Sequence, residues 1–169
     1  MDGYKDRIIT LYHTAYSIIE LSLDLDRSET RFFDFCPFFC YQVFVSATFI
    51  VLKILVNGFF GPLLDHASEM KLLDASIIAL RKLSVVNNDL PARLGDVVGF
   101  FCALPDPTVI GGSTAQDLQL RHVQNRLSVS VVYDSLWVWR KHFHTNDTND
   151  APGVNQGTNY AYVSTFPSG

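Results

Sequence analysis

Basic residues and cysteines are both scarce in this chain of 169 residues, and each shortage excludes a class of protein. The chain has 13 Lys and Arg against 17 Asp and Glu, and its longest basic runs are the pairs Arg81-Lys82 and Arg140-Lys141. Nucleic acids are bound largely by clustered cations that neutralise phosphates. We therefore expect no direct DNA binding by this chain.

The three cysteines, Cys36, Cys40 and Cys102, cannot all pair with one another. We expect no signal peptide, so a reducing intracellular setting fits best. Cys36 and Cys40 are four positions apart, a spacing that would place both on one face of a helix. Two thiolates without His or carboxylate neighbours make a poor zinc site, which needs four ligands. We interpret these cysteines as buried apolar thiols.

Catalytic motifs are also missing. The sequence contains no GxSxG elbow, Walker loop, HExxH pair or dinucleotide fingerprint. The five histidines are His13, His66, His122, His142 and His144. They fall on separate predicted elements, except for His142 and His144, which lie close together at a helix end. We predict no catalytic, cofactor-binding or metal-ligating residue, and we do not expect an enzyme.

Apolar residues, by contrast, are abundant: they make up 48% of the chain, which includes 13 Phe. That is enough to fold one domain around one core. Apolar residues recur at helical spacing in five segments, which we place at about 4–24, 34–56, 66–84, 88–104 and 115–144. The sequence thus predicts an all-α, irregular bundle of about five helices over residues 1–144. The polar composition of residues 145–169 predicts a disordered tail.

The buried face of the first predicted helix is expected to carry Ile8, Leu11, Ala15 and Ile18, and that of the third Leu73, Ile77 and Leu80. In the last helix Trp139 belongs to the inner stripe. Trp137 lies on another face and is a candidate for a contact with a partner.

Helix boundaries are predicted from capping residues and prolines. Asp34 is a candidate N-cap for the second helix, with Pro37 in the first turn and the end at Asn57-Gly58 or Gly61-Pro62. The predicted N-cap of the third helix is Asp65. The fourth helix is expected to begin at Asn88 or Asp89, with Pro91 in its first turn. Ser113 or Thr114 is the predicted N-cap of the last helix.

The second helix has an alternative interpretation. No charged residue lies between Asp34 and Lys53, and residues 35–56 are long enough to cross a membrane. Gln42 and Thr48 dilute this run, Lys53 interrupts it, and its flanks lack the Lys/Arg asymmetry that sets an orientation. We favour a central helix surrounded by other helices, which would be apolar all round for that reason. The alternative is a small membrane-associated helical protein with one span at about 35–56.

Three pieces of the sequence resemble the C-terminal part of the fungal-specific transcription factor domain, the helical middle region of zinc binuclear cluster transcription factors. They are FFCYQVFVSATFIVLKIL, SIIALRKLSVVNNDLPARLGDVV and LRHVQNRLSVSVVYDSLWVWRKHF, and in this order they span about residues 4–144 together with the segments around them. The third is similar to the closing helix of that family.

This resemblance implies a nuclear regulatory or interaction domain that acts in transcription by RNA polymerase II. The family binds DNA through an N-terminal cluster of six cysteines and two zinc ions, which three cysteines cannot build, so no site residue is carried over. With fewer helices than the family's domain, such a bundle would expose apolar helix faces. We therefore expect protein partners or self-association through those faces. A pocket for an unidentified small-molecule effector, lined by the Phe-rich helix, is compatible with this interpretation.

Overall fold

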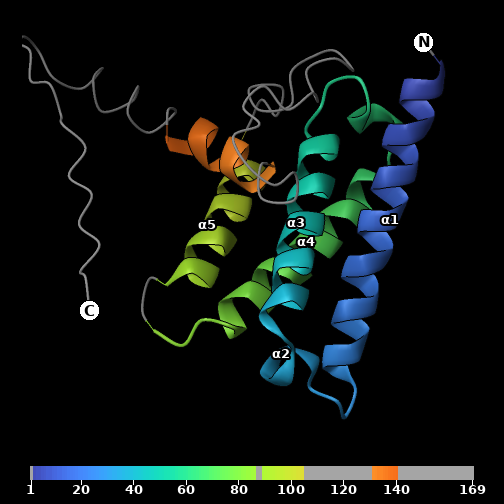
Figure 1. Cartoon of the computed structure of the whole chain (residues 1–169). Coiled ribbons are helices and arrows are strands. Elements are labelled where there is room, and N and C mark those ends of the chain that lie inside the picture. Colours follow the sequence, from blue (N-terminus) through green and yellow to red (C-terminus); the bar gives the residue numbers. More distant parts are fainter. Residues whose placement is uncertain (1, 87–88, 105–130, 141–169) are drawn as a thin grey trace, which may run out of the picture.

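The chain folds as an all-α bundle in the computed structural model, which describes residues 2–86, 89–104 and 131–140. Its elements are α1 (Asp2–Arg27), α2 (Phe32–Phe35), α3 (Phe38–Leu55), the 3₁₀ turn η1 (Gly61–Leu63), α4 (His66–Lys82) and α5 (Leu90–Cys102), and residues 131–140 are also helical (Figure 1). The predicted all-α fold class is confirmed, and the short α2 is an addition. The predicted tail at 145–169 lies outside the described residues.

Helix α3 is the central element of this bundle. It contacts α1, α4 and α5, and Figure 1 shows it between α1 and α5. Ten of its 18 residues are buried: Phe44, Val45, Ala47, Thr48, Phe49, Val51, Leu52, Lys53, Ile54 and Leu55. Phe38 and Phe39 at its beginning are exposed instead. The expectation of a central, enclosed helix therefore holds from Phe44 onward.

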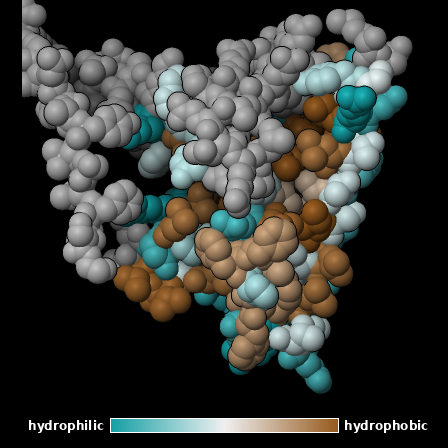
Figure 2. Space-filling model, viewed as in Figure 1, coloured by the Kyte–Doolittle hydropathy of each residue, from teal (hydrophilic) through white to brown (hydrophobic). Residues whose placement is uncertain are grey.

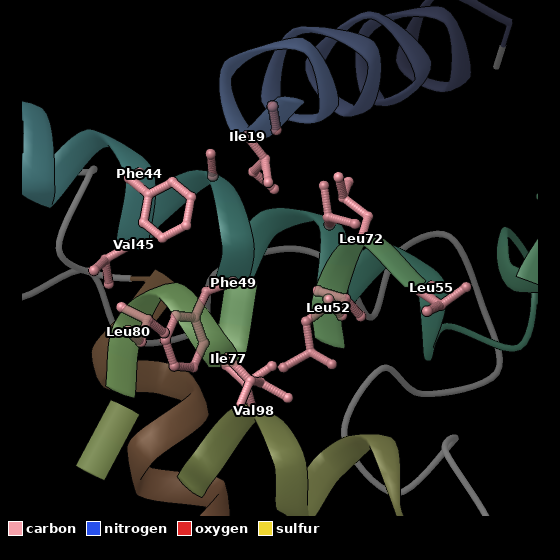
Figure 3. Close-up of a cluster of buried hydrophobic side chains, with 14 of the residues drawn as sticks. Ile19, Phe44, Val45, Phe49, Leu52, Leu55, Leu72, Ile77, Leu80 and Val98 are labelled. Carbon is pink, nitrogen blue, oxygen red and sulfur yellow. The ribbon is translucent and has the colours of Figure 1, made fainter. Parts of the chain in front are cut away.

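The core lies where α1, α3, α4 and α5 meet (Figure 3). Figure 3 shows Ile19, Phe49, Leu80 and Val98, one from each helix, among the side chains gathered there. On α4 the predicted inner stripe of Leu73, Ile77 and Leu80 is buried as expected. Burying such side chains stabilises the fold by roughly 1.5–3 kcal/mol each.

The predicted face of α1 was wrong at one position. Leu11 is exposed, and Tyr12 is buried in its place, together with Ala15, Ile19 and Leu23. One residue corresponds to about 100° of rotation around a helix. Tyr12 can be buried because its hydroxyl finds a carboxylate partner on α4, so the aromatic ring adds apolar area without an unpaired polar atom.

The predicted start of the second helix was also wrong. Asp34 lies within α2, where Arg31 pairs with it at 2.6 Å, and the chain breaks before Pro37, which occupies the N-cap position of α3. Cys36 is extended (φ −69°, ψ 141°), because a proline disfavours helical geometry in the residue before it. Cys36 and Cys40 therefore do not share one helix face, and both are half-buried free thiols.

Other predicted boundaries are confirmed. Helix α3 ends at Leu55, just before Asn57, whose side-chain oxygen accepts hydrogen bonds from the N–H groups of Phe59 and Phe60 at 3.0 and 3.1 Å. Asp65 stands at the N-cap of α4, and Asp89 caps α5 by accepting from the Ala92 N–H at 3.2 Å. Pro91 lies in the first turn of α5, as expected. Helix α1, by contrast, extends beyond both predicted ends, from Asp2 to Arg27 in place of about 4–24.

Candidate interaction surfaces and buried polar pairs

Three phenylalanines protrude where α2 gives way to α3. Phe35, Phe38 and Phe39 are 80%, 67% and 71% exposed, and we call these three residues the aromatic tip. Figure 2 shows apolar colour on the lower part of the molecule in this view, the end at which Figure 1 places α2. A Phe side chain carries roughly 150–250 Å² of surface, so the tip exposes on the order of 400 Å² of apolar area. That lies within the range of the largest apolar patches on monomeric proteins, which are often functional.

The tip is held on a fixed base. Phe33, on the other side of α2, is buried and packs edge to face on Phe44 of α3, with ring centroids 4.8 Å apart. The Phe33 N–H also donates to Asp26 of α1 at 3.2 Å, and Lys82 of α4 pairs with the same carboxylate at 2.9 Å. Because α1, α3 and α4 all contribute to this base, Phe35 is presented to solvent by a short helix that is itself anchored.

An ion pair is buried on the opposite half of α3. Lys53 pairs through Nζ with the carboxylate of Asp134, which lies 81 positions later in the helical residues 131–140. Their side chains are 8% and 16% exposed. Phe49 and Val56, one turn from Lys53 on the same side of the helix, are apolar and buried. A charge in such surroundings is tolerated only with a partner.

A second buried polar pair joins α1 to α4. The Tyr12 hydroxyl donates a hydrogen bond to Glu69 Oε1, and Glu69 is 3% exposed. The other carboxylate oxygen, Oε2, is buried without a hydrogen-bond partner in the described part of the chain. Burial raises the pKa of Glu69, and the nearby carboxylates of Asp65 and Glu20 raise it further. Burial and Glu69 itself raise the pKa of Tyr12 well above its usual range.

A shallow groove of about 280 Å³ also runs between α1 and α4. It is lined by residues of both helices: Tyr16, Glu20, Leu23, Asp24, Arg27, Ser68, Lys71, Leu72 and Ala75. Two acidic and two basic side chains contribute to the lining, so the groove has no dominant charge. Neither a nucleophile–base pair nor a set of metal ligands is among these residues.

The histidines and cysteines do not converge in the described residues. His13 on α1 and His66 on α4 are exposed, and His122, His142 and His144 lie outside the described ranges. Within residues 2–86, 89–104 and 131–140, no group of three or more His, Cys, Asp or Glu could hold a metal ion. Burial and the nearby Asp74 raise the pKa of Cys102 to about 12, so its thiol is a weak nucleophile.

The last predicted helix is described only at residues 131–140, which are helical as expected. Trp139 packs against the core, in agreement with its predicted place in the inner stripe, and Trp137 is 55% exposed. The predicted caps Ser113 and Thr114 lie outside the described residues, as does most of the 115–144 segment.

Comparison with known proteins gives no relative: no family model matches the chain, and neither the curated proteins nor the solved structures contain a match. Sequence reasoning missed both buried pairs and the aromatic tip. The one available signal was Lys53, a single charge inside a long apolar run, which indicates either a helix end or a paired cation.

Proposed function

We propose that this chain is a helical regulatory domain that acts by contacting other proteins, of the type found in the middle region of fungal zinc-cluster transcription factors. The proposal includes a nuclear location and no DNA contact by this chain. The observation that carries it is the aromatic tip. Aromatic side chains, Phe among them, are enriched in the buried cores of protein interfaces relative to the rest of the protein surface, and the three Phe of the tip are exposed.

The arrangement of the helices supports the transcription-factor part of this proposal. The sequence piece FFCYQVFVSATFIVLKIL coincides with α3, Phe38–Leu55. The second piece covers the latter half of α4, a break at the Asp89 cap, and the beginning of α5. Both pieces thus have the helical character that the resemblance implies. The all-α fold on its own is compatible with many functions.

The area of the aromatic tip indicates how it would be used. A standard interface buries about 800 Å² on each partner, roughly twice what the tip exposes. The tip is therefore suited to be the apolar centre of a larger interface with a partner protein. The Arg31–Asp34 ion pair beside it leaves this surface without a net charge to attract polyanions.

A nuclear reporter tests this function. The chain is placed between a heterologous DNA-binding domain and an activation segment, and output is compared with that of a fusion that lacks the chain. We expect the chain to restrain activation. Replacing Phe35, Phe38 and Phe39 together by Ser should relieve that restraint, because the partner loses its apolar anchor.

Two exposed residues away from the tip provide the matched control. Leu21 on α1 and Ile78 on α4 are exposed to a similar degree, and the variant Leu21→Ser/Ile78→Ser should restrain the reporter as strongly as the wild type. Equal output with and without the chain would contradict a regulatory role. Equal relief by the tip variant and the control variant would remove the tip from the proposal.

A second function is favoured by one specific observation. Helix α3 has 18 residues with a mean hydropathy of 1.9, which makes it long and apolar enough to cross a membrane. A membrane-associated protein with one span at about 35–56 would leave the chain in the pellet after carbonate extraction of membranes. Recovery in the supernatant would contradict that function. The buried Lys53–Asp134 pair and the contacts of α3 with three other helices speak for a protein environment.

A further inference from the structure

Lys53 places one buried positive charge in a largely apolar part of the surface of α3. Lys53 Nζ is paired with Asp134, while Phe49 and Val56, one turn away on the same side of the helix, are buried and apolar, and Asn57 beside them is buried as well. An ammonium group without a partner in such a place is strongly unfavourable. Whatever covers this part of α3 must therefore bring a carboxylate to Lys53.

In this structure the cover is the helix of residues 131–140, drawn in orange near the upper ends of α3 and α5 in Figure 1. Its inward side carries the buried Ser135 and the apolar residues that pack against the core: Val131, Val132, Leu136, Val138 and Trp139. Tyr133 and Trp137 point outward and are largely exposed. This is the pattern of an amphipathic helix with an acidic residue, Asp134, beside its apolar stripe.

The cover is held less firmly than the elements it covers. Among residues 131–140 only Ser135 is buried, whereas Val131, Val132, Leu136, Val138 and Trp139 are partly buried against the core. In α3, by comparison, more than half of the residues are buried. Elements that contribute little buried area open at lower free energy than the core does.

From these observations we infer that the α3 surface around Lys53 is a docking site for an acidic amphipathic helix. Residues 131–140 occupy the site from within the chain, and a helix of a partner protein with the same chemistry displaces them. The partner helix carries a carboxylate where Asp134 lies, flanked by aliphatic or aromatic residues at the spacing of Val132, Leu136 and Trp139. Helices without that carboxylate are rejected, because they would leave Lys53 unpaired.

This inference deepens the proposed function, since it names the surface and the kind of partner through which a regulatory domain would respond. It rests on that function for its biological meaning. Its test uses purified protein and no reporter, so a negative reporter result and a negative docking result are separate outcomes.

Intrinsic fluorescence reports directly on the cover. The only two tryptophans of the chain, Trp137 and Trp139, both lie within residues 131–140. We expect Lys53→Glu and Asp134→Lys each to shift the emission to longer wavelength, because like charges then face each other and Trp139 becomes solvated. The double variant Lys53→Glu/Asp134→Lys restores the pair and should restore the wild-type spectrum.

The exposed ion pair Arg81–Asp96, at 3.1 Å between α4 and α5, is the matched control. Its two single charge reversals should leave the emission unchanged. A single Lys53 or Asp134 reversal that also leaves it unchanged would overturn the inference. Circular dichroism identifies a single variant that has failed to fold. In that event the tryptophan emission of the double variant is used: a wild-type emission spectrum supports the inference, and a shifted one overturns it.

Docking in trans is measured with a fluorescein-labelled peptide of residues 131–140, by anisotropy. The Asp134→Lys chain, whose own cover is released while Lys53 is intact, should bind the peptide about tenfold or more tightly than the wild type, in which the site is occupied. A peptide with Asp134→Lys should bind only the Lys53→Glu chain. Binding that ignores the charge at position 134 would overturn the inference. So would a wild-type chain that is dimeric in light scattering and becomes monomeric with Lys53→Glu, because the site would then be occupied by a second copy.

Discussion

The hydroxyl of Tyr12 on α1 donates to Oε1 of Glu69 on α4, and Glu69 Oε2 is buried without a hydrogen-bond partner among the described residues. One donor for a buried carboxylate leaves it incompletely solvated, and burial raises the pKa of Glu69. The folded state is therefore less stable when Glu69 is ionised than when it is protonated.

That cost predicts a pH dependence of stability. Between the ordinary Glu pKa of 4.5 and the raised pKa, folded Glu69 keeps a proton that the unfolded chain releases. Since the folded state binds more protons, its stability falls as the pH rises through this window, by about 1.4 kcal/mol for each unit of pKa shift. Glu69→Gln keeps the shape and removes the titration. We expect it to match the wild type below about pH 4 and to be more stable at pH 7.

Urea unfolding at a series of pH values checks this prediction. Glu29→Gln, on an exposed residue between α1 and α2, is the control for the loss of one negative charge, and it should keep the wild-type slope. A Glu69→Gln variant that follows the wild type in parallel at every pH would show that Glu69 does not titrate in this window.

Replacing Phe49 and replacing Phe39, both on α3, are predicted to have very different effects on the stability of the fold. Phe49 is fully buried in the core (Figure 3), whereas Phe39 belongs to the aromatic tip and is mostly exposed. Phe49→Ala leaves a cavity and should lower the free energy of unfolding by about 3–5 kcal/mol. Phe39→Ala should change it by less than about 0.5 kcal/mol. Urea titration of both variants measures the difference.

This comparison also separates binding from folding at the tip. If Phe39→Ala destabilised the chain as much as Phe49→Ala, the first turn of α3 would be buried in solution. The reporter effect of the tip variant could then arise from unfolding.

The sequence predicted those features that depend on neighbours along the chain. The stripe of Leu73, Ile77 and Leu80 follows from helical spacing, and the Asp89 cap follows from its place before Pro91. Both polar pairs lay beyond such reasoning, because Tyr12 and Glu69 are 57 positions apart, and Lys53 and Asp134 are 81 apart. Partners at such separation are fixed by how the helices pack.

Errors in the predicted helices have the same origin. Leu11 and Tyr12 are adjacent apolar positions, and spacing alone favoured Leu11. Burial of Tyr12 depends on a carboxylate from α4, which the local pattern of α1 cannot reveal. At the beginning of α3, the effect of Pro37 on Cys36 outweighed the tendency of Asp34 to cap a helix.

The N-cap of α5 is predicted to contribute more than an average cap. Asp89 accepts from the Ala92 N–H at 3.2 Å, and its other oxygen accepts from the N–H groups of Val85 and Val86 at 2.9 and 3.3 Å. Asp89→Ala removes all three bonds, so we expect a loss near the upper end of the usual range, about 2 kcal/mol. The control is Asp96→Ala in the same helix, whose exposed pair with Arg81 should contribute less than about 1 kcal/mol. Thermal unfolding followed by circular dichroism compares the two variants, and equal losses would argue against the cap.

Two glycines, Gly61 and Gly3, are predicted to respond in opposite directions to the same substitution. A Cβ at Gly61, where η1 begins, would lie 2.4 Å from the backbone oxygen of Leu55, which is too close for any real contact. Because the atom in the way belongs to the backbone, the turn after α3 must shift, and we expect Gly61→Ala to destabilise the chain by about 1–3 kcal/mol.

At Gly3 in α1 nothing lies within 4 Å, so Gly3→Ala gains helix propensity, by at most about 1 kcal/mol and less at a fraying end. Urea midpoints should therefore fall for Gly61→Ala and rise or stay level for Gly3→Ala. An unchanged urea midpoint for Gly61→Ala would mean that the turn can shift without loss of stability, so that the contact between Gly61 and Leu55 does not determine where α3 ends.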